Sequence, residues 1–343
     1  MSSTRDIPCP ILQQCGGCEL MRLPEEEQLQ DKAQSVEQRL RREIHKVVSS
    51  PSPLNYRARI NLRVGAEGRL CYYRPRSHIE VPVDACAVAR PEINHAIQRF
   101  LPLPSSVQSV EFRSNGHHVI VVLRAPPKQT RRIEKHLAEW DWKAMGIHGA
   151  FINKHSLFGL KKTVLEVAGI EHHLGPHTFY QVNLGINELL VKEVKRIAEE
   201  YNPSAILDMF SGAGNLSLPL AKAGRQLTLM ESNPDAVRDA RSTAKRLGHP
   251  ADVRQIDATR FQAGDAFFDL AILDPARAGA PGILKELAVT RPRAMIYVSC
   301  NPQSFGRDAR EVTQVGYKLK QLDLYDMFPQ TSHIELLGVF ELN

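Results

Sequence analysis

An apolar run at residues 205–210 ends abruptly in a glycine-rich turn, Ser211-Gly212-Ala213-Gly214-Asn215, and this junction narrows the choice of fold. The run predicts a buried strand, and the residues after the turn predict a helix over 216–222. Gly212 and Gly214 let a ligand approach the backbone at the turn. Because open α/β sheets bind ligands at the carboxyl ends of their parallel strands, we expect a Rossmann-like α/β domain over residues 175–343.

Two acidic residues at the ends of the following strands indicate a nucleoside ligand. Glu231 ends the strand predicted at 227–230, where a carboxylate can accept the hydrogens of both ribose hydroxyls. Asp257 ends the next strand, in a position to meet an adenine amino group. Ser217 replaces the third glycine of the dinucleotide fingerprint, which disfavours NAD. We therefore predict S-adenosylmethionine as the ligand, bound by Gly212, Glu231 and Asp257.

Asp274 follows the fourth strand of this domain, predicted at 270–273, and adds a third acid to the same sheet edge. Methyltransferases that act on exocyclic nitrogens usually carry an aromatic residue shortly after this acid, where its ring stacks on the base. This chain has Arg277 instead. The sequence therefore favours methyl transfer to carbon.

Cys300 lies between a buried strand at 296–299 and the helix start Asn301-Pro302, at the carboxyl edge of the sheet. By residue type alone it would be a buried packing cysteine. Carbon 5 of uracil, however, is too weak a nucleophile to take a methyl group unaided. A thiolate added at C6 makes C5 nucleophilic, and a base must then remove the C5 proton. We predict Cys300 as the nucleophile and Glu335, which opens the last strand at 336–342, as the base.

The front half of the chain carries a surplus of positive charge. Residues 1–174 contain 25 Lys and Arg against 18 Asp and Glu, whereas the rest contains 19 against 20, and the net charge is +6. Residues 56–64 alternate arginines with apolar side chains, and Asn115-Gly116 predicts a hairpin turn. We expect a small antiparallel α+β domain over residues 53–174 that binds nucleic acid.

Three cysteines near the start, Cys9, Cys15 and Cys18, form a compact metal-binding pattern within residues 1–23. A fourth ligand must come from Cys71 or Cys86, and we choose Cys86 because Cys71 lies in a strand-like run where packing explains it. Zinc and an iron–sulfur cluster both suit four thiolates. We expect a closed, structural site. Residues 24–52 follow, beginning with a helical pattern.

Large-scale features favour an intracellular protein. The chain contains no run of 18 apolar residues, and its first residues, Met1 to Asp6, lack the pattern of a signal peptide. We expect a cytoplasmic monomer with no membrane partner, in which the six cysteines stay reduced.

Five motifs together resemble the RNA 5-methyluridine methyltransferases of the TrmA/RumA type, over nearly the whole chain. They are Phe179-Tyr180-Gln181-Val182-Asn183, Asp208-Met209-Phe210-Ser211-Gly212-Ala213-Gly214-Asn215, Leu273-Asp274-Pro275-Ala276-Arg277-Ala278-Gly279, Ser299-Cys300-Asn301-Pro302, and Asp326-Met327-Phe328-Pro329 with His333 and Glu335. Ser211 departs from the cysteine of many relatives, and no TRAM RNA-binding domain precedes Cys9.

The resemblance implies roles for the residues that match. Cys300 looks like the nucleophile and Glu335 like the base. The positions that bind S-adenosylmethionine are Gln181, Phe210, Glu231 and Asp274. Those that hold a [4Fe-4S] cluster in ribosomal-RNA members are Cys9, Cys15, Cys18 and Cys86. The family also suggests that the helix within residues 24–52 packs on the catalytic domain.

A cluster without a TRAM domain is similar to the RlmC branch, which implies methylation of 23S rRNA at the uridine equivalent to position 747. The alternative within the family is C5 methylation of uridine 54 in transfer RNA. An alternative of another class is an iron–sulfur RNA-binding protein without turnover. In either enzyme, the target uridine must leave its stack to reach the thiol.

Overall fold

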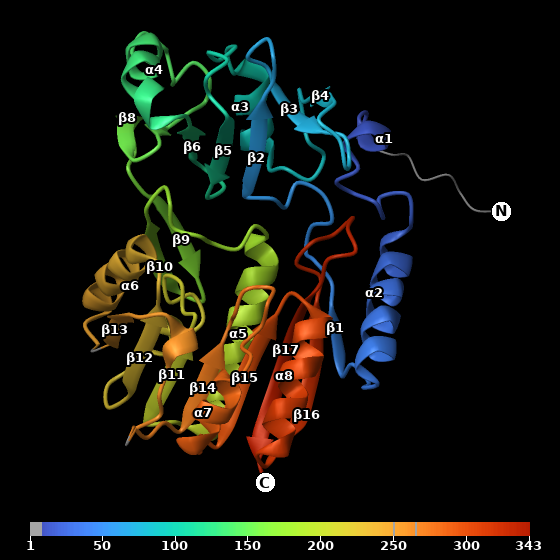
Figure 1. Ribbon diagram of the computed structural model, residues 1–343, viewed down its shortest axis with the longest axis vertical. Helices are drawn as coiled ribbons and strands as arrows, with labels where there is room; N and C mark the ends of the chain where they lie inside the picture. The colour runs from blue at the N-terminus through green and yellow to red at the C-terminus, as the bar shows by residue number, and fades with distance from the viewer. Residues whose placement is uncertain (1–8, 250, 265) are drawn as a thin grey trace, which may run out of the picture. The chain divides into compact units, whose positions relative to one another are not determined.

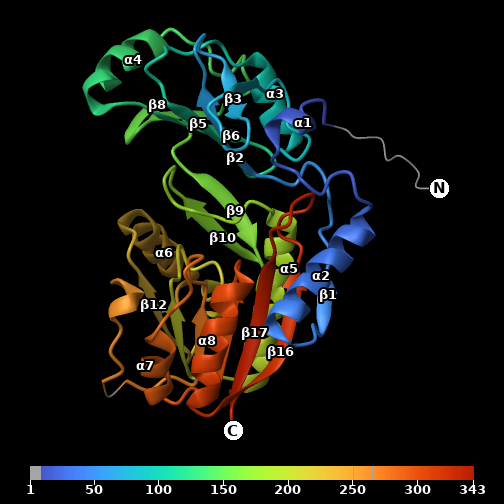
Figure 2. The same ribbon diagram turned by 45° about the vertical axis from the view of Figure 1, so that its right-hand side comes forward.

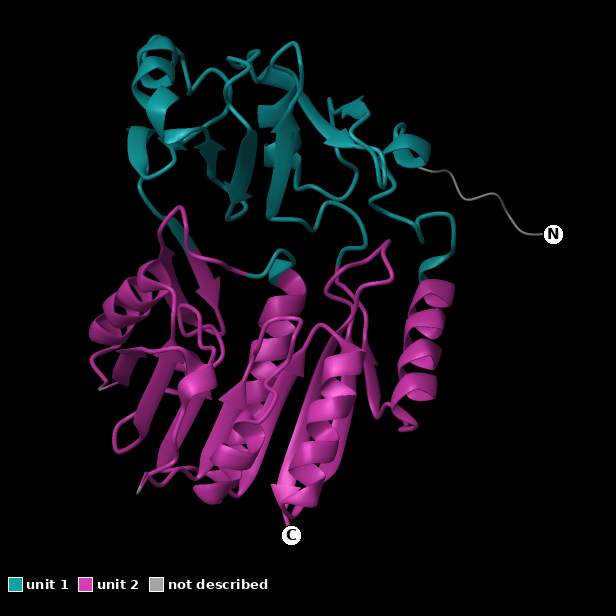
Figure 3. Cartoon of the chain, viewed as in Figure 1, with its two compact units in different colours: residues 1–25, 52–164, 181–184 teal, residues 26–51, 165–180, 185–343 magenta. Residues whose placement is uncertain are grey.

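The computed structural model describes residues 9–249, 251–264 and 266–343, and the chain forms two compact units (Figure 3). Unit 1 comprises residues 1–25, 52–164 and 181–184, and unit 2 comprises residues 26–51, 165–180 and 185–343. The start of the predicted cluster segment and the N-terminal stretch tested for a signal peptide, residues 1–8, lie outside the described residues.

Unit 2 is built on a mixed eight-stranded sheet in the order β1-β16-β17-β15-β14-β11-β12-β13 (Figure 1). β17 is antiparallel to both of its neighbours, whereas every other pairing in this sheet is parallel. The strands are β1 (Lys46–Val48), β11 (Ala205–Met209), β12 (Gln226–Glu231), β13 (Ala251–Gln255), β14 (Leu270–Leu273), β15 (Ala294–Ser299), β16 (Tyr317–Tyr325) and β17 (Glu335–Leu342). The expected Rossmann-like domain is confirmed.

Helices cover this sheet, as Figures 1 and 2 show. They are α2 (Glu25–Leu40), α5 (Leu184–Tyr201), α6 (Pro234–Leu247), α7 (Ile283–Val289) and α8 (Pro302–Gln314). α6 packs on β12 and β13, and α8 packs on β15 and β16. The central strands are buried on both faces, since every residue of β14 and β15 is buried. This rigid sheet holds the loops at its carboxyl edge in place.

The segment at residues 26–51 contributes α2 and β1 to unit 2. β1 pairs in parallel with β16, with Lys46 opposite Asp323. The helical pattern expected in this segment comes from apolar residues at spacings of three and four, Leu29, Ala33, Val36 and Leu40, but the buried residues of α2 are Gln28, Lys32 and Val36. The polar members of this set find partners more than 290 residues away, which no local pattern reveals.

Unit 1 contains a seven-stranded sheet in the order β4-β3-β2-β5-β6-β7-β8. Its strands are β2 (Arg59–Val64), β3 (Leu70–Tyr73), β4 (Glu80–Pro82), β5 (Ser109–Ser114), β6 (Val119–Arg124), β7 (Gly149–Ile152) and β8 (His155–Gly159), and its helices are α1 (Leu12–Cys15), α3 (Pro91–Arg99) and α4 (Thr130–Leu137). All pairings are antiparallel except that of β6 with β7. The expected antiparallel α+β domain is thus confirmed in its main features.

Two expected elements differ from the structure. The helix predicted at 216–222 is only a single 3-10 turn, Leu218–Leu220, because the chain turns into extended backbone at Ala221 and into the left-handed region at Gly224. Residues 163–167, which lie inside the α+β domain expected at 53–174, form β9 (Thr163–Val167), but this strand pairs with β10 (Ile170–Leu174) in a separate two-stranded sheet.

None of the helices in the described part of the chain is long and apolar enough to cross a membrane.

Candidate active site

Strand register brings four of the predicted site residues to one edge of the unit 2 sheet. Ser299 of β15 lies opposite Leu336 of the antiparallel β17, so the next residue of one strand, Cys300, and the first residue of the other, Glu335, share an end of the sheet. The parallel pairings of β14 with β11 and β15 place Asp274 there as well, and those of β11 place Phe210. This edge is the candidate active site.

Cys300 is held between a strand end and a helix start. Asn301 caps α8 by accepting a hydrogen bond from the backbone N–H of Gln303, and Pro302 occupies the first helical position. The Asn301 side chain also donates to the carbonyl of Arg277 at 2.9 Å. The thiol therefore lies on rigid backbone that is tied to the loop after β14.

Two carboxyl groups surround the Cys300 thiol and oppose its ionisation. Burial, followed by the charges of Glu335 and Asp274, raises the pKa of Cys300 to about 11. Burial raises the pKa of Asp274 to about 7, and burial together with the charge of Asp274 raises the pKa of Glu335 well above its ordinary value. Glu335 is 3% exposed. A thiol, a buried acid and a partly buried acid thus share one electrostatic environment.

The positive charge of Arg277 favours ionisation of the Cys300 thiol, because it lowers the pKa of Cys300. The loop that carries Arg277 ends at Ala280. The Asp308 carboxylate fixes this end by accepting hydrogen bonds from the Ala280 N–H at 2.8 Å and the Tyr297 hydroxyl at 2.6 Å. The sequence singled out Arg277 only as a departure from an aromatic residue. Its spacing from Asp274 was the available signal for a role at the thiol.

The glycine turn after β11 leaves room for a ligand. Gly212 has a φ of +55°, and no heavy atom of the described residues lies within 4 Å of a Cβ built on it. Its N–H donates to Glu231 Oε2 at 2.9 Å, and the Asn233 N–H donates to Oε1 of the same carboxylate at 2.6 Å. Phe210, just before the turn, is held at a φ of +61°, which non-glycine residues rarely adopt.

Asp208 is a buried acid to which the sequence assigned no role. It lies in β11, is 1% exposed, and neither of its carboxylate oxygens has a hydrogen-bond partner within the described ranges. The Ser217 hydroxyl favours the charged form but also completes no hydrogen bond there. Burial, with smaller contributions from Asp274 and Glu231, raises the pKa of Asp208 to about 8. An acid inside an apolar strand was the signal for this residue.

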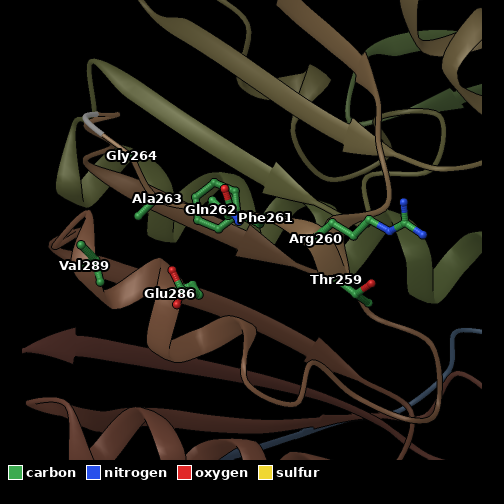
Figure 4. A pocket seen from close by; sticks show the side chains of 8 residues that line it. All are labelled: Thr259, Arg260, Phe261, Gln262, Ala263, Gly264, Glu286 and Val289. Carbon is green, nitrogen blue, oxygen red and sulfur yellow. The ribbon is translucent and has the colours of Figure 1, made fainter.

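Asp257 lies just after β13, where it caps a short 3-10 turn by accepting from the Thr259 N–H at 3.0 Å and the Thr259 hydroxyl at 2.7 Å. A shallow pocket of about 710 Å³ begins at Thr259 and is lined by residues 259–264 together with Glu286 and Val289 of α7 (Figure 4). None of the predicted catalytic or cofactor-binding residues lines it, so we do not assign the ligand to this pocket.

Gln181 belongs to the short stretch of unit 1 at residues 181–184. Its predicted contact with S-adenosylmethionine stays a prediction, as do those of Phe210, Gly212, Glu231, Asp257 and Asp274.

The four predicted cluster ligands all lie in unit 1 and are free thiols. Cys9, Cys18 and Cys86 pack around the buried Met21, Tyr56 and Val88. Gly16, between Cys15 and Cys18, has a φ of +64°, and a Cβ on it would lie 2.3 Å from Pro75 Cγ. Only glycine therefore suits this tight turn.

The thiols interact but do not form a coordination shell. Burial first, and then the charges of Cys86 and its neighbours, raise the pKa of Cys18 to about 12 and also raise that of Cys15. No group of three or more His, Cys, Asp or Glu among the described residues is arranged to hold a metal ion. The number and type of ligands suit a metal cluster, and the cluster itself stays a prediction.

Comparison with known proteins adds independent findings. Residues 206–282 match the family model described as "Methyltransferase domain". The chain is 30% identical to an "Uncharacterized RNA methyltransferase" of Aquifex aeolicus, over 98% of this chain and 84% of that protein. It is also 30% identical to the "23S rRNA (uracil(1939)-C(5))-methyltransferase RlmD" of Vibrio campbellii, over 97% of this chain and 81% of that protein.

A solved structure agrees with these relatives. The Pyrococcus abyssi tRNA (uracil-54, C5)-methyltransferase, in complex with S-adenosyl-L-homocysteine, superimposes with a TM-score of 0.78 at 25% identity and covers 94% of this chain and 85% of its own. The branch expected from the sequence, RlmC with uridine 747, has no support here, since the ribosomal-RNA relatives bear the RlmD name. That expectation rested on the cluster cysteines together with the lack of a TRAM domain before Cys9, and this combination did not identify the branch to which the relatives belong.

Proposed function

The chain belongs to the family of RNA uracil-C5 methyltransferases, and we propose on that basis that it uses S-adenosylmethionine to methylate carbon 5 of a uridine in 23S rRNA. The observation that carries the proposal is the single electrostatic environment shared by the half-buried Cys300 thiol, the buried Glu335 and the partly buried Asp274. The names of the RlmD relatives support 23S rRNA as the substrate.

The cofactor would bind at the carboxyl edge of the unit 2 sheet, where it supplies an electrophilic methyl group. The open space over Gly212 suits a ligand, and the Asp208 carboxyl group, which has no hydrogen-bond partner among the described residues, suits one that carries positive charge. We assign Glu231, Asp257, Asp274, Phe210 and Gln181 to its binding. A cation bound beside Asp208 and Asp274 would also lower the raised pKa values of these acids.

Cys300 begins and ends the reaction. Its thiolate forms a bond to C6 of the flipped uridine, which moves electron density to C5 and makes that carbon nucleophilic. Arg277 favours the thiolate through its charge. Once C5 carries the methyl group, the Glu335 carboxylate takes the C5 proton, the ring double bond re-forms, and the C6–S bond breaks to release Cys300. Burial and the Asp274 charge make Glu335 a stronger base than an exposed glutamate.

We propose a [4Fe-4S] cluster on Cys9, Cys15, Cys18 and Cys86 with a structural role in unit 1. Burial raises the pKa values of the Cys9, Cys15 and Cys18 thiols, and bound iron would stabilise their thiolates.

The proposed target is the uridine equivalent to position 1939, after the names of the RlmD relatives. A second candidate is uridine 54 of transfer RNA, because the Pyrococcus abyssi enzyme of similar fold carries that name. Mapping 5-methyluridine in ribosomal and transfer RNA from cells with and without the gene distinguishes these targets.

Transcripts that contain 5-fluorouridine test the chemistry directly, because fluorine at C5 cannot leave as a proton. With S-adenosylmethionine present, the wild-type protein should form an RNA adduct that survives denaturing electrophoresis. Cys300→Ala should form none, whereas Cys71→Ala, which removes a buried cysteine of unit 1, should still form it. A wild-type protein that binds RNA yet forms no adduct with either RNA would favour the iron–sulfur RNA-binding protein without turnover.

A further inference from the structure

Helix α2 contacts the loop that leads from β16 to Glu335, residues 326–334, through two polar side chains on one helix face. Lys32 Nζ donates hydrogen bonds to Asp326 Oδ1 at 2.6 Å and to the Phe328 carbonyl at 3.1 Å. Gln28 Nε2 donates to Gln330 Oε1 at 3.0 Å, and the Gln330 N–H donates to Gln28 Oε1 at 3.0 Å. In Figures 1 and 2, α2 lies beside this loop.

These contacts are buried. Lys32 is 3% exposed, Gln28 is 2% exposed and Gln330 is 0% exposed. Gln28 and Lys32 are four residues apart, and Val36, four further on, completes the same buried stripe. Apolar side chains in such a stripe would give comparable or greater stability than a buried ion pair. The polar side chains of Gln28 and Lys32 therefore indicate that this stripe fixes the conformation of the loop and does not serve stability alone.

The loop has a backbone that needs support from outside. Gln330 is held at a φ of +70°, in the left-handed region that favours glycine. A residue stays in that region only when its surroundings fix it, and the Gln28 amide fixes both the N–H and the side chain of Gln330. Thr331 Oγ1 donates to the Phe328 carbonyl at 2.9 Å, the same oxygen that Lys32 contacts. Glu335 follows Gln330 by five residues.

We propose that Gln28 and Lys32 are positioning residues, which hold the loop at 326–330 so that the Glu335 carboxylate meets the C5 proton. This inference rests on the proposed function, in which Glu335 acts as the base. It predicts a selective defect. Loosening the loop should slow proton removal and release of the RNA, but it should leave the attack by Cys300 on C6 nearly unchanged, because Cys300 is held by β15 and α8.

The test uses the full chain, natural uridine-containing RNA and a methyl-labelled cofactor, under single-turnover conditions. Adduct formation and adduct decay are measured separately in wild type, Lys32→Met, Gln28→Met and the matched control Gln34→Met, an exposed residue of α2. We expect decay to slow about tenfold in Lys32→Met, less than the 10²–10⁴-fold that a positioned base contributes, because the base is misplaced and not removed. Adduct formation should change by less than about twofold, since a rigidly held nucleophile keeps its alignment. Lys32→Arg should restore most of the decay rate.

The outcomes are distinguishable. A wild-type protein that forms no 5-fluorouridine adduct refutes the proposed function. If the wild type forms the adduct, and Lys32→Met and Gln28→Met both release RNA at the rate of Gln34→Met, the inference is wrong. It is equally wrong if formation and decay fall by the same factor. Should Lys32→Met fail to fold, Gln28→Met, which leaves the ion pair intact, still gives one of these results.

Discussion

Replacing Asp208 by asparagine should make the ligand-free protein progressively more stable relative to the wild type as the pH rises from 5 to 7. Burial raises the pKa of Asp208 to about 8 in the folded state, against about 3.9 in the unfolded chain. The folded carboxyl group therefore stays protonated where the unfolded one ionises. The stability that depends on a protonated Asp208 is fully present below the unfolded-state pKa and is lost as the pH rises toward the folded-state pKa.

The size of the effect follows from the two pKa values. At about 1.4 kcal/mol per pKa unit, the wild type loses about 1–2 kcal/mol by pH 5 and about 4 kcal/mol by pH 7. Asparagine has nearly the same shape and does not ionise. Its amide leaves a fixed penalty of about 1–3 kcal/mol for unpaired polar atoms, which does not depend on pH. The increase of about 2–3 kcal/mol between pH 5 and pH 7 is therefore the quantity to test.

Urea unfolding should be followed by far-ultraviolet circular dichroism, because both tryptophans, Trp140 and Trp142, lie in unit 1 and do not report on Asp208. The matched control is Asp257→Asn. Asp257 is exposed, and hydrogen bonds from Thr259 lower its pKa, so its removal should give a small effect of opposite sign. A stability difference between Asp208→Asn and wild type that stays constant from pH 5 to pH 7 would refute the reasoning.

Three further predictions concern the thiols and their surroundings. In ligand-free protein, alkylation of Cys300 by iodoacetamide, followed by peptide mass spectrometry, should accelerate about tenfold per unit from pH 7 to pH 9, because its pKa is about 11 and the thiolate reacts; a plateau below pH 9 contradicts this. After anaerobic reconstitution, Cys86→Ser should retain less iron than Cys71→Ser, and equal iron in both would exclude Cys86 as a ligand. Gly16→Ala should destabilise unit 1 by about 1–3 kcal/mol, measured by tryptophan fluorescence, since its backbone is left-handed and Pro75 blocks a Cβ; an unchanged unfolding midpoint would contradict this.

The sequence predicted the parts of the site that local patterns encode. The buried strand before Cys300 and the Asn301-Pro302 helix start both occur as expected, because a run of apolar residues and a cap residue act within a few positions. The same holds for Glu231 at the end of β12 and for Asn233 as the cap of α6. Parallel strand order then brings such residues to one edge without further information.

Features that depend on distant partners escaped prediction. The burial of Gln28 and Lys32 is one example. Nothing near them in the chain indicates that they form hydrogen bonds with Gln330 and Asp326. The 216–222 segment has helical composition, but the fold extends the chain at Ala221. The choice between the RlmC and RlmD branches also escaped prediction, because the five motifs that identify the family do not distinguish its branches.

The path of the chain between its two units affects how the protein is made and dissected. The backbone passes from one unit to the other five times, and β1, which includes Lys46, pairs with β16, whose partner residue is Asp323. On the ribosome, the first edge strand of the larger sheet must wait for almost the entire polypeptide to emerge before it can pair. A single cut anywhere between residues 52 and 164 leaves both halves incomplete, so isolating either unit requires rejoining separated segments rather than simple truncation.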